Sequence, residues 1–277
     1  MYVGLDNRLE WQTDTLTAAS SSNAQLEGDD SPTATAVVPT VRLGNYTQIS
    51  RKIPMVTGSQ RAADNAGRGD ELNYQEAKMG LELRRDMESA HLANNARNAG
   101  AAATARVSAG VLSWIKNNTS KGAGGSDPAA ADGTGTRTDG TQRALTETLV
   151  KDVAQLIWAE GGNPDRIMGN AFQRRQIDNF TGGNTRFLDV KDEVLHTTFS
   201  VYTTSWGKMK IIPNRFMRTR DVLLLQNDMW ALAYYRTFKS EELAKTGDAT
   251  KKQLIVEQTL ESRNEKASGG VFDLLDA

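Results

Sequence analysis

Residues 41–53 have the composition of a β-strand, in which successive side chains point to opposite faces with a period of two. One face would carry Val41, Leu43, Asn45, Thr47, Ile49, Arg51 and Ile53, and the other Arg42, Tyr46, Gln48 and Lys52. Because both faces mix polar and apolar residues, neither is suited to bury a core of its own. We therefore expect residues 1–62 to be extended and to form a ribbon that projects from the body, with a bend in the Ala-, Ser- and Asp-rich stretch 17–35.

The following segment has the pattern of a long amphipathic helix. No proline occurs from Asp70 to about Arg97, and one helical stripe is formed by Leu72, Met79, Leu83, Met87 and Ala90. Asp70 is suited to cap the first turn. The charged residues that lie off the stripe include Lys78, Glu82, Arg85 and Glu88. About 28 helical residues would form a rod of about 42 Å, whereas helices of globular proteins average about 11–12 residues.

Residues 99–142 are rich in small and polar side chains, with glycine at 122, 124, 125, 133, 135 and 140. Such a composition buries little apolar surface and predicts a long surface loop. A short apolar helix is expected around Val107, Val111, Leu112, Trp114 and Ile115.

A mixed α/β pattern follows the glycine-rich stretch. A second amphipathic helix is predicted by Leu145, Leu149, Val153, Leu156 and Ile157, and it would end at Gly161 and Gly162. A short strand is expected at Ile167 and Met168, followed by a helix that Asn170 caps and that runs to about Phe180.

Strand patterns dominate from Val194 to the end of the chain. Alternating positions are Thr197, Phe199 and Val201, then Met209 and Ile211, with a turn near Trp206 and Gly207. Residues 222–225 and 229–235 are expected to form a hairpin, and Leu254, Val256 and Leu260 to mark a final long strand. The fold class is therefore α+β.

Composition and charge exclude several classes of function. The chain has 277 residues, a formal net charge of −1 and no cysteine. No global basic field favours nucleic acid, so any contact with DNA would be local and weak. The absence of cysteine excludes disulfides and thiolate chemistry and fits a reducing compartment. No apolar run approaches the ~20 residues of a membrane span, and no signal-peptide pattern is present, so we expect a soluble chain made inside the cell.

The sequence carries none of the common active-site motifs, such as a phosphate-binding loop or a nucleophile elbow. The two histidines, His91 and His196, lie far apart in sequence, and residues 132–139 lack the ligand positions of a calcium-binding loop. Scattered arginines are suited to surface solvation or subunit pairing more than to phosphate binding. The five tryptophans suit core anchors or interface hot spots more than a cofactor cage. We expect no catalytic residue, no cofactor and no metal site.

Seven strings in a fixed order point to a known family. They are EWQTDTL (10–16), NAQLEGDD (23–30), PTVRLGNYTQIS (39–50), GTRTDGT (135–141), PNRF (213–216), ELAKTGD (242–248) and ASGG (267–270). From about residue 8 to its end, the chain resembles the SU-ten-type family of tailed-bacteriophage major head proteins, which carry the Hong Kong 97-type capsid fold.

The resemblance implies a division of the chain. Residues 1–62 would be an N-terminal segment with an extended loop, and residues 63–100 the part of the peripheral domain that contains the spine helix. Residues 101–204 would be the axial domain, whose glycine-rich loop lies near the capsomer axis, and residues 205–277 would return strands to the peripheral domain.

The resemblance also implies contacts between subunits, in which the ribbon of one chain lies over the spine helix of a neighbour. The candidate contact residues are Val41, Arg42, Leu43, Tyr46, Ile49, Arg51, Lys52 and Ile53 in the ribbon and Glu82 and Arg85 in the helix. The family also has an N-terminal arm ahead of the Trp11 strand, where this sequence begins, so contacts through an arm are not predicted.

The resemblance further implies that the chain self-assembles into pentamers and hexamers of an icosahedral head around double-stranded DNA, without a membrane. Scaffold, portal and decoration proteins would be further partners. The location would be the virion, after assembly in the cytoplasm of the bacterial host. The alternatives are another phage structural subunit, either a decoration or a tail-tube protein, and an enzyme.

Overall fold

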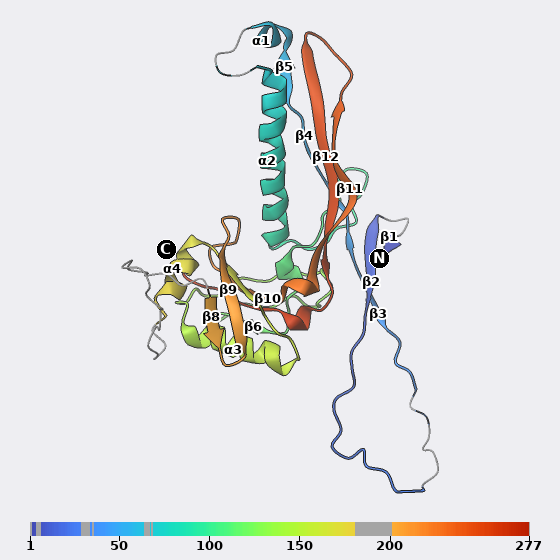
Figure 1. The fold of residues 1–277 in the computed structure, drawn as a ribbon, viewed down its shortest axis with the longest axis vertical. Helices are drawn as coiled ribbons and strands as arrows, with labels where there is room; N and C mark the ends of the chain where they lie inside the picture. Colours follow the sequence, from blue (N-terminus) through green and yellow to red (C-terminus); the bar gives the residue numbers. More distant parts are fainter. Residues whose placement is uncertain are drawn as a thin grey trace, which may run out of the picture.

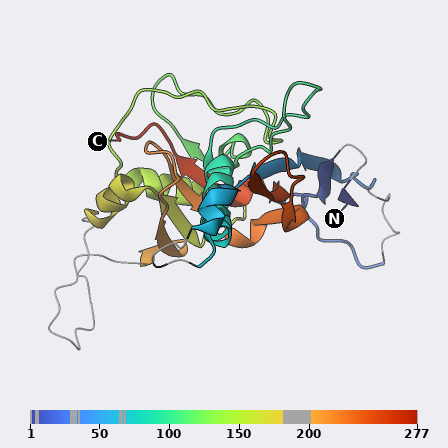
Figure 2. The ribbon, with the colours of Figure 1, turned by 90° about the horizontal axis from the view of Figure 1, so that it is seen from above.

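The computed structural model of the chain (Figure 1) describes residues 2–3, 7–28, 34, 36–63, 67, 69–180 and 201–276. His196 and the strand positions Thr197 and Phe199 lie outside the described residues. The described parts form a long spine, a lobe at one end of it, and an extended ribbon. Seen from above, the lobe and the ribbon lie on opposite sides of the spine (Figure 2).

The spine is built on α2 (Glu71–Leu92), whose first turn is capped by Asp70 as predicted. The Asp70 carboxylate accepts a hydrogen bond of 2.9 Å from the backbone N–H of Leu72. The predicted end near Arg97 is wrong, because Ala93 adopts an extended backbone and α2 has 22 residues. The residues that follow are held by another segment, since the N–H of Arg97 donates to the carbonyl of Gly133 at 2.7 Å.

A four-stranded antiparallel sheet runs along the spine helix (Figure 1). Its order is β11 (Trp230–Glu242), β12 (Ala249–Ser262) and β4 (Gln48–Lys52), and β5 (Met55–Thr57) also pairs with β12. Leu83 and Met87 of α2 pack on Val256 of β12 in a small buried cluster. The predicted long strand around Val256 is confirmed. A short helix, α1 (Gly58–Ala62), interrupts the predicted extended stretch 1–62 near the far end of the spine.

The ribbon is a second sheet, in the order β1 (Tyr2–Val3), β2 (Arg8–Thr13) and β3 (Val41–Tyr46). β2 and β3 pair antiparallel, with Thr13 opposite Val41, so the chain between them forms the long loop of the ribbon. The predicted strand 41–53 is therefore two strands in two different sheets, which meet at Thr47.

The lobe contains a mixed six-stranded sheet flanked by α3 (Glu147–Ala159) and α4 (Ala171–Asp178). Its order is β6 (Thr119–Ser120), β13 (Gly269–Val271), β10 (Val222–Leu225), β7 (Arg166–Gly169), β9 (Gly207–Pro213) and β8 (Val201–Thr204). The helices predicted over 145–157 and 170–180 are confirmed, as is the Asn170 cap. A boundary between residues 204 and 205 falls inside the β8–β9 hairpin, and the later strands divide between two sheets.

The predicted hairpin between residues 222–225 and 229–235 is wrong. β10 pairs with β7 and β13 in the lobe, while β11 pairs with β12 in the spine sheet. A 3-10 turn, η2 (Asn227–Met229), carries the chain from one sheet to the other. All four residues of β10 are buried, which is the pattern of an interior strand and not of a hairpin strand with one exposed face.

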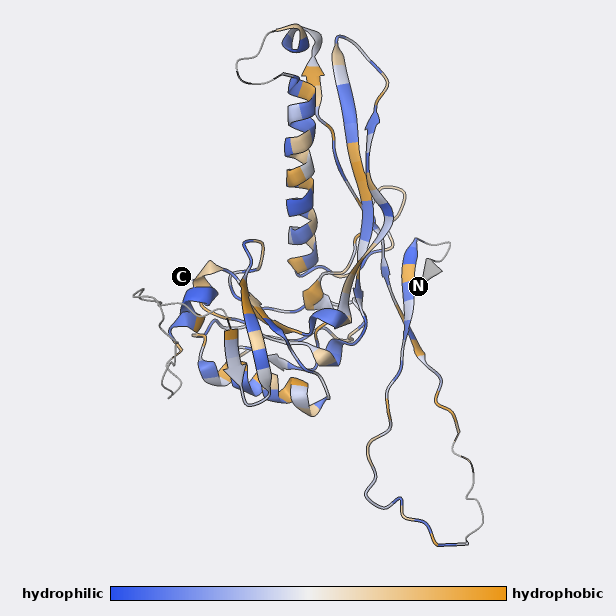
Figure 3. Cartoon of the chain, in the orientation of Figure 1, coloured by the Kyte–Doolittle hydropathy of each residue, from blue (hydrophilic) through white to orange (hydrophobic). Residues whose placement is uncertain are grey.

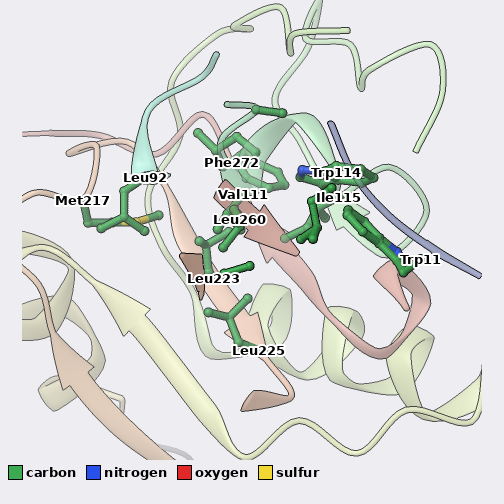
Figure 4. Close-up of a cluster of buried hydrophobic side chains, with 14 residues drawn as sticks. Trp11, Leu92, Val111, Trp114, Ile115, Met217, Leu223, Leu225, Leu260 and Phe272 are labelled. Atoms are coloured by element: carbon green, nitrogen blue, oxygen red, sulfur yellow. The ribbon is translucent and has the colours of Figure 1, made fainter. Parts of the chain in front are cut away.

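The main core lies where the ribbon, the spine and the lobe meet (Figure 4). Trp114 and Ile115 follow the 3-10 helix η1 (Val111–Ser113) and are fully buried there. Trp11 of the ribbon packs against Trp114 with ring centroids 5.5 Å apart. The apolar helix expected near residue 112 is thus a single turn, and a second core under α3 fills the lobe.

Candidate subunit interface

The described residues of the ribbon loop 14–40, namely 14–28, 34 and 36–40, are the most exposed apolar part of the described chain. Leu16 is 100% exposed and Val37 is 91% exposed, and Leu26 and Val38 are also largely exposed. Figure 3 shows these apolar segments in orange, far from the body of the molecule. The hydrogen bonds seen among its described residues are local, as between the N–H of Ser22 and the hydroxyl of Ser20. Such exposure is typical of a surface that another chain covers.

The loop has a charge of one sign. From residue 14 to 40 the sequence has the acids Asp14, Glu27, Asp29 and Asp30 and no lysine or arginine. A segment of this kind is repelled by acidic surfaces and is attracted to basic or apolar ones.

The root of the ribbon, residues 8–13 and 41–47, is by contrast held firmly by the body. Leu9 and Trp11 lie in the main core, and Asn45 and Thr47 are buried polar residues. The guanidinium of Arg97 donates a hydrogen bond to the carbonyl of Gly44. The prediction that the strand 41–53 has no core of its own is therefore wrong for residues 41–47, which pack against the body.

The predicted contact residues separate into two groups. Val41, Arg42, Leu43 and Tyr46 lie in β3, in the ribbon. Ile49, Arg51 and Lys52 lie in β4, which pairs with β12 of the same chain, and Ile53 follows β4. The structure therefore places the second group in the spine, next to the predicted helix residues Glu82 and Arg85.

Three predicted residues of the spine line one cavity of about 360 Å³, namely Lys52, Glu82 and Arg85, together with Asp86, Ser89 and Phe216. Lys52 forms an ion pair of 2.8 Å with Asp86. The Arg85 guanidinium lies 5.6 Å from the centre of the Phe216 ring. Ile49, Arg51 and Ile53 alternate with Lys52 along the strand and so face the other side of the sheet.

A second groove, of about 620 Å³, lies on the other side of α2, against β11. Its apolar wall includes Met87, Trp230, Leu232, Tyr234 and Phe238. The Arg84 guanidinium lies 5.6 Å from the Phe238 ring centre, at the edge of the groove. This groove is not predicted above, although its aromatic wall has a sequence signal. Trp230, Leu232, Tyr234 and Phe238 occupy every second position with one gap, a pattern that marks one face of a strand.

The glycine-rich segment 121–142 is an irregular surface loop, as predicted, but buried charges tie it to the body. Asp273 accepts hydrogen bonds from the N–H groups of Gly122 at 3.0 Å and Gly140 at 2.7 Å. Arg137 is 5% exposed, forms an ion pair with Asp127, and lies with its guanidinium 3.4 Å from the Phe272 ring centre. This segment is part of the body.

Two carboxyl groups in this cluster have shifted pKa values of opposite sign. Burial raises the pKa of Asp221 to about 6, although the Arg218 guanidinium opposes the shift. Burial acts to raise the pKa of Asp139, but the hydrogen bonds from Arg218 at 2.6 and 2.8 Å and the charges of Arg218, Arg220 and Arg137 together lower it below its usual value.

The described part of the chain offers few other groups that could form a catalytic or metal site. His91 lies in the wall of the aromatic groove, and burial lowers the pKa of its imidazole. No group of three or more potential metal ligands occurs among the described residues. No described helix is long and apolar enough to cross a membrane.

Comparisons with known proteins agree with one another. The family model described as SU10 major capsid protein matches residues 6–275. The major capsid protein of Escherichia phage Phieco32 is 27% identical over 297 residues, which cover 95% of this chain and 84% of that protein.

Solved structures show the fold. A chain of Microbacterium phage Oxtober96 has a TM-score of 0.61 at 10% identity, covering 97% of this chain and 86% of its own. The capsid of a native GTA particle has a TM-score of 0.61 at 11% identity, with coverage of 97% and 86%. The capsid of Cyanophage A-1(L) has a TM-score of 0.58 at 11% identity, with coverage of 97% and 88%. These neighbours have the Hong Kong 97-type fold, as the strings in the sequence had implied.

Proposed function

The chain belongs to the SU10 major capsid protein family and is a major capsid subunit of a phage head, and on that premise we propose how its copies join. The exposed loop of the ribbon carries the proposal, because its apolar side chains have no cover in the described part of their own chain. We propose that the loop of one copy lies on the spine of the next, in rings of five and six that close into an icosahedral shell around double-stranded DNA.

The two groups of predicted contact residues take different parts in this contact. Val41, Arg42, Leu43 and Tyr46 lead into the loop and belong to the side that reaches across. Lys52, Glu82 and Arg85 belong to the face of the spine that receives it. Ile49, Arg51 and Ile53 lie on the opposite face of the sheet and are not assigned to this contact. Arg85 supports this assignment, because the loop has only acidic charges and Arg85 offers a positive one in the cavity. The other cation of the cavity, Lys52, is already paired with Asp86, and Glu82 adds a second acid, so the attraction rests on Arg85.

The domain division is proposed with two refinements. The part of 1–62 that precedes residue 48 keeps its assignment to the extended loop, and β4 and β5 join residues 63–100 in the spine, because both pair with β12. The six-stranded sheet unites β9, β10 and β13 with the strands of 101–204, so these three belong with the axial domain, while β11 and β12 belong with the spine.

The remaining parts of the proposal follow from the family. Scaffold, portal and decoration proteins are proposed partners, contact with DNA is weak and non-specific, and assembly takes place in the host cytoplasm. No enzymatic step is proposed, because the family is one of structural proteins. The family match favours the major capsid subunit over a decoration or tail-tube subunit.

The test is to express the full chain alone and to examine it by negative-stain electron microscopy and light scattering. Closed shells, or rings of five or six, are expected. Long tubes of stacked six-fold rings would favour a tail-tube subunit. A monomer at every concentration would contradict self-assembly of this chain without a scaffold.

A shortened variant locates the contact. Replacing residues 15–39 with a short turn leaves β2, β3 and the body intact, so the subunit should fold with an unchanged circular dichroism spectrum and form no shells. Arg85→Glu should likewise reduce the yield of shells, whereas the matched control Arg84→Glu, on the β11 side of the helix, should not. A loss with Arg84→Glu alone would move the receiving surface to the aromatic groove.

A further inference from the structure

The ribbon leaves the body at a single residue between two sheets. β3 ends at Tyr46 in the ribbon sheet, and β4 begins at Gln48 in the spine sheet, so Thr47 is the one residue between them. The contacts that hold this junction, together with Leu9 and Trp11 in the main core, determine the direction in which the exposed loop points. We name residues 45–47 the elbow.

The elbow is held by buried hydrogen bonds. Asn45 is 0% exposed, and its amide donates to the carbonyl of Leu260 at 2.8 Å and to the hydroxyl of Ser108 at 3.0 Å. Its side-chain oxygen accepts from the N–H of Ala109 at 2.9 Å. One side chain thus joins the ribbon to two segments that are remote from it in sequence.

A buried carboxylate completes the elbow. The Thr47 hydroxyl donates to Glu257 at 2.6 Å, and the same carboxylate accepts from Arg106 at 2.6 Å and from Arg236 at 2.7 Å. Glu257 is 2% exposed and lies on β12, the central strand of the spine sheet. The spine sheet and the ribbon are therefore joined by a polar network instead of by apolar packing alone.

Directional bonds fix an angle in a way that apolar contacts do not. Apolar contacts have no preferred direction, whereas a buried amide that rotates leaves its hydrogen-bond partners unsatisfied. About ten extended residues reach roughly 33 Å, so a turn of 10° at the root would move the end of that span by about 6 Å. Small changes at the elbow would thus displace the contact with the next subunit.

We infer that Asn45 is a positioning residue, which fixes the direction of the ribbon and thereby the size of the shell that the subunits close. The predicted effect on shell size rests on the proposed function. The predicted effect on the direction of the ribbon in the free subunit does not.

The first experiment measures the angle itself. Because the sequence has no cysteine, Gln12→Cys in β2 and Leu81→Cys in α2 give two unique spin labels, studied with an excess of unlabelled protein. The distance distribution should be narrow in the parent chain and at least twofold wider after Asn45→Ala. An unchanged width would overturn the inference.

The second experiment separates positioning from stability. Asn118 is a matched control, since it is also buried and its amide also donates to backbone carbonyls, those of Lys266 and Ser268. Asn45→Ala and Asn118→Ala should lower the melting temperature by similar amounts. Only Asn45→Ala should broaden the distribution of shell diameters in electron micrographs.

The two variants can also give results that contradict the inference. Equal shell diameters in both would show that Asn45 is merely structural. If Asn45→Ala does not fold, Thr47→Val removes one bond of the elbow with little change of shape, and the same widening is expected. If the parent chain forms no shells, the proposed function fails. The distances between the spin labels still test whether Asn45 fixes the direction of the ribbon.

Discussion

Two loops of this subunit are both rich in small and polar residues, but one extends away from the body and the other is held against it. They are the ribbon loop, residues 14–40, and the glycine-rich segment, residues 121–142. The first extends away from the body with exposed valines and leucines, and the second is tied to the C-terminal segment through Asp273. A few buried charges, and not the average composition, decide whether such a loop belongs to the body or remains available to another chain.

Glycine has a different role in each loop. At Gly28 in the ribbon, the φ angle is +81° and nothing lies within 4 Å of an added Cβ, so this glycine serves a turn in open space. At Gly140, a Cβ would lie 2.5 Å from the backbone nitrogen of Gly125, so this glycine permits a close approach. The same residue type marks freedom in one loop and tight packing in the other.

The largest effect on folding is expected at Asp273, which joins the glycine-rich segment to the C-terminal segment. Asp273→Asn tolerates the left-handed backbone at this position, where φ is 59°, but removes a charged acceptor from two backbone N–H groups and from Arg220. We expect a loss of about 1–3 kcal/mol in the free energy of unfolding, measured by urea denaturation. Asp14→Asn in the ribbon is the control and should change it by less than about 0.5 kcal/mol. Equal losses would remove the distinction between the loops.

An effect of similar size, but one that depends on pH, is expected at Asp221. Its pKa rises from 3.8 to about 6 on folding, with Arg218, Arg137, Asp139 and Arg220 as the charged neighbours. Because the folded pKa is the higher one, the protonated form favours folding. This contribution is complete below about pH 4 and is lost as the pH rises through 6.

The measurement is the free energy of unfolding of the parent chain and of Asp221→Asn at pH 4.5, 5.5 and 7.5. The parent chain should lose about 1–3 kcal/mol relative to the variant over this range. Two curves that stay parallel would show that the carboxyl group of Asp221 does not titrate there.

The smallest effect on folding is expected in the ribbon loop. Replacing Val37 and Val38 with serine should change the free energy of unfolding by less than about 0.5 kcal/mol, because both side chains are already exposed. The yield of shells in electron micrographs should nevertheless fall. Val150→Ser in the buried face of α3 is the control and should destabilise the subunit itself. An unchanged yield of shells would show that these valines make no contact.

Much of the fold follows from local patterns in the sequence. The Asp70 cap and the stripe that includes Leu72, Leu83 and Met87 predict α2, because capping and helical spacing are set by near neighbours. The end of α2 was misplaced, because it depends on contacts with residues near 133 that no local pattern reveals. The pairing of β10 was misjudged for the same reason, since strand partners are chosen by the whole sheet.

The candidate interface was predictable in part. The composition of 41–53 identifies a strand, but it does not show that the chain changes sheets at Thr47. The grouping of Lys52, Glu82 and Arg85 in one cavity is what the structure adds. The aromatic groove does not follow from the predicted hairpin of 222–225 with 229–235, because β11 pairs with β12 in the spine sheet and there faces α2.

Hydrogen exchange, compared in dispersed subunits and in assembled shells, tests the central claim most directly. Backbone amides of 122–142 should exchange slowly in both states, because they are tied within the subunit. Amides of 14–28 and 36–40 should exchange rapidly in dispersed subunits and slowly in shells, because another copy covers them. Equally rapid exchange of the ribbon loop in both states would contradict its role in joining subunits.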